Sequence, residues 1–565
     1  SIGVIGGTNV QFAHDPATGR IIIIEINPRT SRSSALASKA TGFPIALVSA
    51  KLAAGLTLDE IPYWRDGTLE KYTPSGDYVV VKFARWAFEK FRGVEDRLGT
   101  QMKAVGEVMA IGKTYKEAFQ KAIRSLENGR SGLGFARDFN TRSLPELLDL
   151  LRVPTSERQW ILYEAIRKGA TDGQLFELTR IKPWFLGQMR ELVALEERLL
   201  RHKGRVPPAD LLAEAKRDGF ADKYLARILG VPERAIRDAR TAAGVVEAWD
   251  AIPVSGVRES SYFYSTYHTE RVALPSWEKR KAAAPAAKKR VVILGGGPNR
   301  IGQGIEFDYC CVHAALALKK QGYETIMVNC NPETVSTDYD ISDKLYFEPL
   351  TVEDVLQIYA RERPAGVVVQ FGGQTPLNIA RELAGNGVAI LGTSIDAIDL
   401  AEDRDLFRKM MDKLAIPMPE SGMAATADEA VRIAATIGYP LMIRPSFVLG
   451  GRGMEVIYDE AQLREYVDRA VGVTPELPLL IDRFLQNALE CEADALADGH
   501  DVFIPAIMEH VELAGIHSGD SACVLPPVNI PGKHRETILA YTRKIAQELH
   551  VVGLMNMQYA IEKDK

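Results

Sequence analysis

The sequence predicts an α/β protein with an inserted all-α domain, and three observations carry this prediction. Strand-like apolar runs alternate with helical runs over the first 129 residues. The pattern changes to closely spaced amphipathic helices from about 130 to 250, and then returns to alternating strands and helices. Because 565 residues are too many for one hydrophobic core, we expect about three or four domains.

Composition argues against several classes of protein. The chain is 46% hydrophobic and 25% charged, and no apolar run approaches the roughly 20 residues that a membrane-spanning helix needs. Its 69 basic and 74 acidic side chains leave a net charge of −5, which favours no polyanionic partner. The five cysteines form no CxxC pair, which argues against structural zinc and a disulfide framework. We therefore expect a cytoplasmic protein with no membrane and no nucleic-acid partner.

The first α/β stretch and the helical stretch have distinct local signals. Strand-like runs lie at 21–26 and 78–83, and helical runs lie at about 34–54 and 115–126. In the helical stretch, the pairs Ser143/Glu146 and Thr171/Gln174 are spaced as capping boxes, and Pro183 suits a first helical turn.

A segment at 221–240 has the spacing of a helix-turn-helix. A nucleic-acid role would need basic residues on the second helix, and Arg234, Arg237 and Arg240 are present there. Because Glu233 and Asp238 balance them, structural packing is the preferred interpretation.

The second α/β stretch follows a connector that we expect to be poor in strands. This connector is aromatic, with Tyr262, Phe263, Tyr264 and Tyr267, and a basic Ala/Pro linker at 279–290 follows it. A new domain should begin near Arg290. Short apolar runs at 291–294, 325–328, 366–369 and 388–391 alternate with helical segments, which predicts βαβ units.

A long-range repeat is the most informative feature. Gly6-Gly-Thr-Asn-Val-Gln-Phe-Ala13 aligns with Gly553-Leu-Met-Asn-Met-Gln-Tyr-Ala560 at an offset of 547 residues. So short a match can arise by chance, but an internal repeat has to be considered before a fold is assigned. If the repeat is real, the chain holds the end of one module and most of a second. We then expect an internal stretch of a longer protein.

Polar residues follow the predicted strand at 21–26. Glu25 and Asn27 are two apart on a strand and share one face, which suits Mg²⁺ bound between protein and nucleotide phosphates. Gln11 could supply a further oxygen, and Arg29 could neutralise a phosphoryl group in transfer. The alternative is a strand end with a turn and solvated charges.

Two glycine-rich segments could cradle phosphates. Gly450-Gly-Arg-Gly453 follows Arg444 in the second module, and a simple hairpin turn is the alternative there. Gly295-Gly-Gly-Pro-Asn-Arg-Ile-Gly-Gln-Gly304 lies between a predicted strand and a predicted helix. Its spacing departs from GxGxxG, so a nicotinamide site is a weak interpretation.

Polar and acidic residues also crowd the segment 509–522. They include His510, Glu512, His517, Ser518, Asp520 and Ser521, with Glu490 and Glu492 upstream. Oxygen-rich residues suit a magnesium-nucleotide or monovalent-cation site better than zinc. Solvated loop charge is the alternative.

Together these motifs are similar to those of one family. The runs that carry the resemblance are Asn9-Val-Gln-Phe-Ala13, Glu25-Ile-Asn-Pro-Arg-Thr-Ser-Arg-Ser-Ser-Ala-Leu-Ala-Ser-Lys-Ala-Thr-Gly-Phe-Pro44, 295–309, Val328-Asn-Cys-Asn-Pro-Glu-Thr-Val-Ser-Thr-Asp338, Gln370-Phe-Gly-Gly-Gln-Thr-Pro376, Arg444-Pro-Ser-Phe-Val-Leu-Gly-Gly451 and 509–523. The chain resembles the large chain of carbamoyl phosphate synthetase over essentially every residue.

The resemblance implies two duplicated ATP-grasp modules, the second preceded by a Rossmann-like pre-ATP-grasp domain. The implied parts are the end of the first module (1–129), a helical oligomerisation domain and connector (130–282), the pre-ATP-grasp domain (283–400) and an incomplete second module (401–565). The first module would phosphorylate bicarbonate to carboxyphosphate, which ammonia converts to carbamate. The second would phosphorylate carbamate to carbamoyl phosphate. Implied cofactors are ATP, Mg²⁺ or Mn²⁺, and K⁺, and the implied partners are a glutaminase small chain supplying ammonia and other copies of the chain.

The resemblance also implies roles for individual residues. In the first module Gln11, Glu25 and Asn27 match metal ligands, and Arg29 and Arg32 match arginines on the substrate side. Residues of the second module that match nucleotide or metal contacts are Arg404, Arg444, Arg483, Leu485, Glu490, Gly515, Ile516, His517, Ser518 and Gln558. Arg483 occupies a position that is often histidine in the family. Glu490, His510 and Ser521 match a potassium site.

The chain also departs from the family pattern, and other functions remain to be weighed. The family's first nucleotide-binding half lies before Ser1, and its second ExNPR motif and regulatory domain lie beyond Lys565, so we expect this polypeptide alone to make little or no carbamoyl phosphate. A biotin-dependent carboxylase is the alternative within the same fold, but the repeat and the helical segment argue against it. The alternative from another class is a nucleic-acid or scaffold role for the helical segment.

Overall fold

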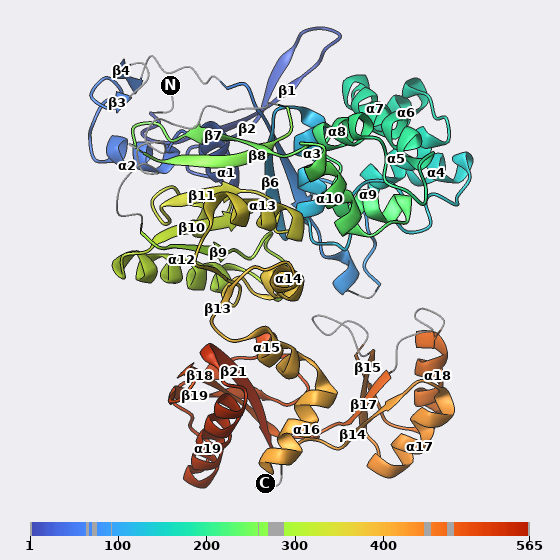
Figure 1. Cartoon of the computed structure of the whole chain (residues 1–565), viewed down its shortest axis with the longest axis vertical. Helices are drawn as coiled ribbons and strands as arrows, with labels where there is room; N and C mark the ends of the chain where they lie inside the picture. The colour runs from blue at the N-terminus through green and yellow to red at the C-terminus, as the bar shows by residue number, and fades with distance from the viewer. Residues whose placement is uncertain are drawn as a thin grey trace. The chain divides into compact units, whose positions relative to one another are not determined.

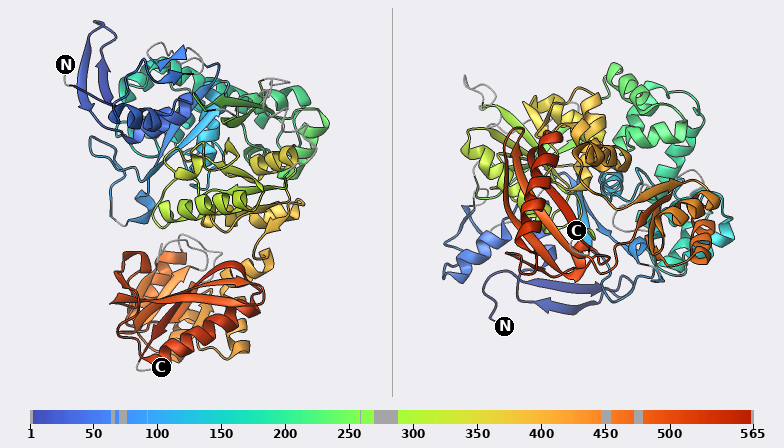
Figure 2. Two further views of the ribbon diagram at one scale, coloured as in Figure 1. Left: turned by 90° about the vertical axis from the view of Figure 1, so that its left-hand side faces the viewer. Right: turned by 90° about the horizontal axis from the view of Figure 1, so that it is seen from below.

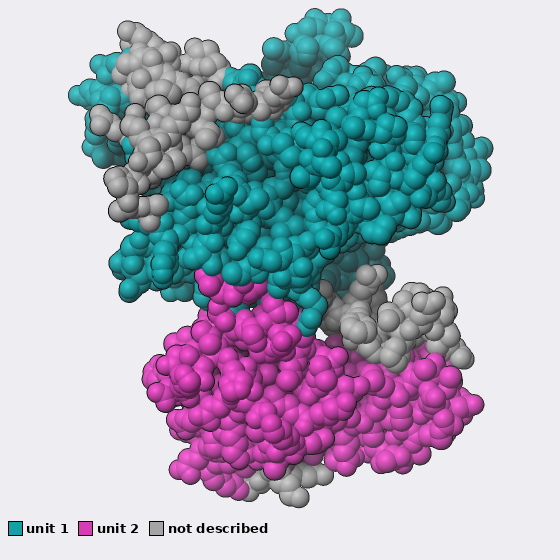
Figure 3. Space-filling model, in the orientation of Figure 1, with its two compact units in different colours: residues 1–389 teal, residues 390–565 magenta. Residues whose placement is uncertain are grey.

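The computed structural model describes residues 3–63, 67–69, 76–91, 93–257, 259–268, 288–445, 454–471 and 479–562 (Figure 1). The chain forms two compact units, Ser1–Ala389 and Ile390–Lys565 (Figure 3). Within the described ranges, no helix has both the length and the apolar character needed to cross a bilayer.

The first unit begins with an antiparallel hairpin of β1 (Asn9–His14) and β2 (Ile21–Asn27), which projects from the rest of the unit (Figure 2). Two helices follow, α1 (Arg32–Thr41) and α2 (Ile45–Ala53). The helical structure predicted at about 34–54 is confirmed, and a break at 42–44 divides it into two helices. Gly42 ends α1 with a φ of 71°, and a Cβ there would meet the Pro253 carbonyl oxygen at 2.3 Å. Only glycine fits this approach, so the chain turns before α2.

A second antiparallel pair packs against a long helix. The strands are β5 (Val79–Arg85) and β6 (Gly106–Gly112), and the helix is α3 (Tyr115–Ser125), which confirms the strand and helix predicted here. Every residue of β6 is buried. The short elements of this region are β3 (Pro62–Tyr63), β4 (Gly67–Thr68) and η2 (Phe88–Lys90).

From 126 to 247, all of it described, the chain forms helices and turns and no strand. The helices are α4 (Leu144–Leu150), α5 (Arg158–Arg167), α6 (Asp172–Thr179), α7 (Pro183–Leu200), α8 (Ala209–Arg217), α9 (Asp222–Leu229) and α10 (Glu233–Ala242). Both predicted capping boxes are present, before α4 and α6, and Pro183 is the first residue of α7. One continuous core joins these helices to the preceding strands, because Phe83, Val108 and Phe119 belong to the same buried cluster as Trp160 and Leu192.

A seven-stranded sheet follows, in the order β13–β12–β9–β10–β11–β8–β7. Neighbouring strands from β12 to β8 run parallel, and β7 is antiparallel to β8. The strands are β7 (Ala248–Pro253), β8 (Ser261–Thr266), β9 (Arg290–Leu294), β10 (Glu324–Asn329), β11 (Lys344–Phe347), β12 (Gly366–Val368) and β13 (Ile390–Leu391). The connecting helices are α12 (Ile305–Lys320), η3 (Val335–Thr337), α13 (Val352–Glu362) and α14 (Gln374–Gly385). The parallel strands confirm the predicted βαβ units.

The expectation that the aromatic connector is poor in strands is wrong. Tyr262, Phe263 and Tyr264 lie in β8, where every residue is buried between β11 and β7. Their rings contact Phe347 and Tyr346 of β11 and extend the sheet through aromatic pairs. Aromatic residues favour strands because their rings pack well on a pleated, buried surface. Most of the expected linker at 279–290 lies outside the described residues.

A buried network of charged side chains joins α8, α9 and α10 to α13. Lys216 Nζ pairs with Glu353 and lies 2.9 Å from Asp222 Oδ1, and Arg240 Nε lies 2.7 Å from Asp222 Oδ2. The backbone N–H of Asp222 donates to Glu353 Oε2 at 2.6 Å. None of these four side chains is more than 4% exposed. Arg240 is thus buried in an ion pair, which supports structural packing for the segment with helix-turn-helix spacing.

The second unit contains two four-stranded antiparallel sheets, in the orders β14–β17–β15–β16 and β20–β19–β18–β21. The first sheet consists of β14 (Ser421–Ala424), β15 (Leu441–Pro445), β16 (Glu455–Ile457) and β17 (Leu479–Arg483). The second consists of β18 (Leu489–Asp498), β19 (Val502–Leu513), β20 (Cys523–Val524) and β21 (Val552–Ile561). The helices of the unit are α15 (Ile395–Glu402), α16 (Arg404–Leu414), α17 (Ala427–Ile437), α18 (Glu460–Val471), η4 (Ser518–Asp520) and α19 (Gly532–Glu548).

Each sheet of the second unit has its own apolar core. Ala430 and Ala434 of α17 pack with Leu463 of α18 on the first sheet. Ile538 of α19 packs on the second sheet beside Cys491. The two sheets therefore pack on separate apolar cores. The predicted site residues of the second module are divided between the two sheets.

Candidate functional site

The β1–β2 hairpin brings the three predicted metal ligands of the first module together. Gln11 lies directly opposite Glu25 in the strand register, and Asn27 Nδ2 donates to Glu25 Oε1 at 3.0 Å. A register shift follows Gln11. Bulges of this kind re-aim side chains next to functional sites. A carboxylate and two amide groups thus converge on one end of the hairpin.

The two predicted arginines of the first module follow this hairpin at the start of α1. Ser31 and Ser34 form a capping box that begins the helix, so Arg32 is its first residue. Arg32 Nε lies 2.6 Å from Glu333 Oε1, whereas Arg29 Nη1 donates to the carbonyl oxygen of Thr30 at 3.0 Å. Arg29 therefore makes no ion pair with a carboxylate among the described residues. It follows Glu25 by four residues in the sequence.

The matching strand of the second module is β21. Gln558 lies opposite Glu492 of β18, and its Nε2 donates to Glu492 Oε1 at 3.0 Å and to Ser518 Oγ at 2.9 Å. Two register positions away, Asn556 Nδ2 donates to Asp494 Oδ1 at 3.0 Å and to Glu492 Oε2 at 3.3 Å. The predicted ligand Gln558 and the predicted nucleotide contact Ser518 are therefore in direct contact.

His510 lies at the centre of the acidic cluster. Its side chain is 1% exposed, its Nε2 lies 3.4 Å from Glu492 Oε1, and its Nδ1 lies 3.9 Å from Glu490 Oε1. Neither ring nitrogen has a hydrogen-bond partner in the described part of the chain. Burial raises the pKa of Glu490, His510 opposes that shift, and Glu492 adds to it. Ser521, by contrast, donates from Oγ to the His517 carbonyl oxygen at 3.3 Å, within its own loop.

Two predicted arginines converge on one carboxylate of the other sheet. Arg404 Nη1 lies 2.6 Å from Asp482 Oδ2, and Arg444 Nη2 lies 3.9 Å from the same oxygen. Asp482 is on β17 and Arg444 on the neighbouring β15, so the sheet sets their separation. This arrangement concentrates positive charge at one place, as the binding of nucleotide phosphates requires.

Arg483 bridges the two sheets of the unit. It is the last residue of β17, and its Nη2 lies 3.6 Å from Glu562 Oε2, just after β21. The half-buried Leu485 follows two residues later. Leu485 and Arg483 thus lie in the segment that joins the arginine-bearing sheet to the sheet that carries Gln558.

The loop from Gly515 to Ser518 has a conformation that depends on glycine. Gly515 has a φ of +112°, and a Cβ there would meet Phe484 Cζ at 2.7 Å. Ile516 is 49% exposed, and His517 Nδ1 accepts a hydrogen bond from the Gly519 backbone at 3.1 Å. The loop therefore presents Ile516 and His517 beside Ser518, the contact of Gln558.

We predict that Gly515→Ala destabilises the second unit by about 1–2 kcal/mol, because alanine is strained at this φ and clashes with Phe484. A lower thermal unfolding midpoint would show it. Gly519→Ala is the matched control, since its φ is not positive and its nearest neighbour is His517 Nδ1 at 3.4 Å. An equal shift for both variants would contradict the prediction.

Sequence reasoning missed part of this site. Asp482, which holds the two arginines, stands in no motif, and only its position on β17 reveals it. The sequence did contain a signal for Asn556, because the repeat aligns this residue with Asn9. Gly450-Gly-Arg-Gly453 lies outside the described residues. Over the described ranges, no group of three or more His, Cys, Asp and Glu side chains is arranged to hold a metal ion.

Comparison with protein families covers most of the chain. The model of the "Carbamoyl phosphate synthase preATP-grasp domain" matches residues 287–400. The model of the "Carbamoyl-phosphate synthetase large chain, oligomerisation domain" matches residues 107–244. That of the "Carbamoyl-phosphate synthase L chain, ATP binding domain" matches residues 1–61 and 403–565. The chain belongs to the family of carbamoyl phosphate synthetase large chains.

Curated members of the carbamoyl phosphate synthetase family agree with this assignment. A carbamoyl phosphate synthase large chain of Archaeoglobus fulgidus is 54% identical over 575 residues, covering 100% of this chain and 52% of its own length. A large chain of Pseudomonas syringae pv. tomato is 52% identical, covering 99% of this chain and 52% of its own length. The chain thus spans about half the length of the curated relatives it matches.

Solved structures give weaker similarities. A biotin carboxylase from Campylobacter jejuni is 17% identical, with a TM-score of 0.40, over 49% of this chain and 63% of that chain. The biotin carboxylase domain of the Hydrogenobacter thermophilus 2-oxoglutarate carboxylase is 20% identical, with a TM-score of 0.39, over 49% of this chain and 61% of that chain. Similarities this low carry no argument about the carbamoyl phosphate synthetase fragment.

Proposed function

We propose that the protein containing this chain makes carbamoyl phosphate from bicarbonate, ammonia and two molecules of ATP, by way of carboxyphosphate and carbamate. The first module would act on bicarbonate and the second on carbamate. Each step needs charge neutralised on a phosphoryl group in transfer, and fixed arginines and metal ions provide this.

One observation supports the proposal most strongly. The strand that carries the repeated glutamine motif occurs twice, as β1 and β21, and a different neighbouring strand places a carboxylate opposite the glutamine in each copy. In β1 the strand has Glu25 opposite Gln11, and in β21 it has Glu492 opposite Gln558. Aligning the copies through the repeat gives one composite site, in which carboxylates from two neighbouring strands surround the glutamine. The ATP-binding family model also matches in two separate segments, 1–61 and 403–565.

The residues of the first module fit a divalent metal. Gln11, Glu25 and Asn27 supply carboxylate and amide oxygens, which Mg²⁺ or Mn²⁺ prefers. A bound metal would neutralise phosphate charge. Arg29 and Arg32 would hold the bicarbonate-derived group, and Arg32 would do so beside its ion pair with Glu333.

The second module would bind ATP between its two sheets. We propose nucleotide contacts from Arg404, Arg444, Arg483, Leu485, Glu490, Gly515, Ile516, His517, Ser518 and Gln558, with Arg444 also acting on the transferring group. Gln558 and Glu490 would bind the metal. Glu490, His510 and Ser521 would form the potassium site, in which the partly buried carboxylate of Glu490 would supply negative charge.

The domain arrangement and the partners belong to the same proposal. The helices of 130–282 would form an all-α domain inserted between the two ATP-grasp modules, and they would mediate assembly of several copies, as the name of the matching family model suggests. A glutaminase small chain would supply ammonia. The expectation that the 565-residue chain alone makes little product stays a prediction.

Product and stoichiometry test the proposed function. The full-length protein, supplied with labelled bicarbonate, an ammonium salt and ATP, should form carbamoyl phosphate with two ADP released for each product. Transfer of the label to biotin, with no carbamoyl phosphate, would instead favour a biotin-dependent carboxylase.

A further inference from the structure

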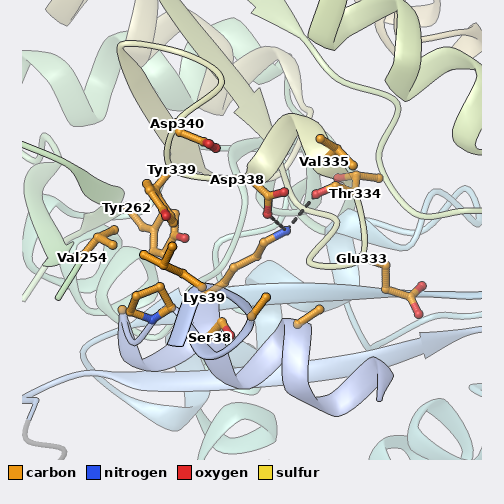
Figure 4. Close-up of a pocket in the computed structure, with 15 residues that line it drawn as sticks. Ser38, Lys39, Val254, Tyr262, Glu333, Thr334, Val335, Asp338, Tyr339 and Asp340 are labelled. Atoms are coloured by element: carbon orange, nitrogen blue, oxygen red, sulfur yellow. Dashed lines mark hydrogen bonds and ion pairs between the residues drawn. The ribbon is translucent and has the colours of Figure 1, made fainter. Parts of the chain in front are cut away.

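A cavity of about 340 Å³ lies within the first unit, and none of the residues assigned above to ATP or metal binding lines it (Figure 4). Its walls come from three separate parts of the chain: α1 and α2, the segment around β7 and β8, and the turn at 333–340. Its size is within the range of small-molecule sites. Pro44, Leu47 and Val254 supply apolar wall.

The ammonium group of Lys39, in the lining of this cavity, already has a partner for each of its protons. Lys39 Nζ donates to the carbonyl oxygens of Pro332 (2.9 Å) and Thr334 (2.8 Å) and to Thr337 Oγ1 (2.7 Å), and it lies 3.1 Å from Asp338 Oδ1. Figure 4 shows Lys39 reaching from α1 to this turn. An ammonium has three protons to donate, so Lys39 has no capacity left for an anion.

Three polar groups of the cavity remain without a partner. Asp340 is exposed and its carboxylate makes no ion pair or hydrogen bond with the described residues. The hydroxyls of Tyr262 and Tyr339 likewise donate to no described group, although Tyr262 is only 2% exposed. Both hydroxyls belong to residues that line the cavity, and each oxygen has lone pairs that can accept a hydrogen bond from a bound ligand.

These groups also influence one another electrostatically. Burial raises the pKa of Tyr262, and Asp338, Tyr339 and Asp340 raise it further. Burial likewise raises the pKa of Asp338; Lys39 opposes that shift, and Asp340 adds to it. Asp338 and Asp340 therefore repel each other, and Glu333 is a third carboxylate in the lining. Lys39 is the one lysine or arginine among the lining residues, so the net charge of the lining is negative.

We propose that this cavity binds a small organic cation, an ammonium or guanidinium compound with a short aliphatic chain. The cationic group lies between Asp338 and Asp340 and donates hydrogen bonds to the carboxylate of Asp340 and the hydroxyl of Tyr262. The tyrosine rings favour a cation on their faces, and the aliphatic chain lies against Leu47 and Val254. A bound ligand would thus contact both α1, which carries Arg32, and the turn that carries Glu333.

The test is titration calorimetry of the 565-residue chain with n-butylguanidinium and n-butylammonium chloride. The neutral isostere n-butylurea and the anion pentanoate serve as controls for shape and charge. We expect saturable binding of at least one cation, weakened by added salt, and no saturable binding of the urea or the anion. Equal binding of n-butylurea would show a merely apolar cavity and overturn the proposal.

Two substitutions locate the binding. Asp340→Asn and Tyr262→Phe should each weaken cation binding by about tenfold, because each removes a hydrogen-bonding group facing a charged ligand. Asp149→Asn is the matched control, since Asp149 is 81% exposed on α4 and does not line the cavity. Circular dichroism and the unfolding midpoint of each variant show whether it has folded. Absence of binding to the folded wild-type chain, or binding that survives both substitutions, contradicts the proposal.

Discussion

Replacing Lys216 with methionine should lower the free energy of unfolding of the first unit by about 3–5 kcal/mol. Lys216 pairs with both Asp222 and Glu353, and none of the three is more than 4% exposed. Without the ammonium, Glu353 loses its ion pair, and the hydrogen bond from the Asp222 backbone and the more distant charges of Arg240 and Arg124 remain. Urea unfolding followed by tryptophan fluorescence measures the change, because Trp160 lies in the helical core.

An exposed lysine provides the control for this loss. Lys223 is on the neighbouring helix α9, is exposed and forms no salt bridge with the described residues, so Lys223→Met should change stability by less than about 0.5 kcal/mol. If Lys216→Met were as mild as Lys223→Met, the buried network would contribute little to the fold. A double variant with Glu353→Leu should recover part of the loss, because it removes the unpaired charge.

Two substitutions in the full-length enzyme should separate the two half-reactions. Glu25→Ala should reduce bicarbonate-dependent ATP hydrolysis about 100-fold and leave ATP formation from carbamoyl phosphate and ADP much less affected. Arg444→Ala should do the reverse, since Arg444, which lies beside Asp482, belongs to the segment that we propose as the second module. In the proposed mechanism Glu25 would bind the metal that neutralises the transferring phosphoryl group, and Arg444 would contact that group directly, which accounts for the size of the effect.

Matched variants keep this test specific. Arg20→Ala changes an exposed residue at the end of the β1–β2 loop, and Arg432→Ala changes an exposed residue on α17. Both should leave the two partial reactions within about twofold of the wild type. Equal losses in both reactions for Glu25→Ala would argue against separate sites for bicarbonate and carbamate.

Local patterns in the sequence predicted most of the elements. The capping boxes at Ser143 and Thr171 begin helices, and the apolar runs after Arg290 form the parallel strands of the large sheet. Such features depend on neighbouring residues, so a single sequence reveals them. The prediction that the aromatic segment of β8 would be poor in strands was wrong. This strand is stabilised by its neighbours β11 and β7, and its sequence does not alternate between apolar and polar residues.

Long-range pairing could not be predicted in this way. Lys216 and Glu353 are 137 residues apart, and Arg404 and Asp482 are 78 apart, so no spacing rule links either pair. Gln11 and Glu25 are an exception, because a hairpin brings nearby residues together and the repeat had already singled out the glutamine. Sequence reasoning therefore found the first group of site residues more completely than the second.

The shared core of the first unit limits how this protein can be divided for study. A cut at residue 129 would place Phe83, Val108 and Phe119 on one piece and Trp160 and Leu192 on the other. Each piece would then expose apolar surface that the intact chain covers, and both would tend to aggregate. A helical piece meant to stay in solution should begin before Val79, so that both strands and α3 remain with the helices they cover.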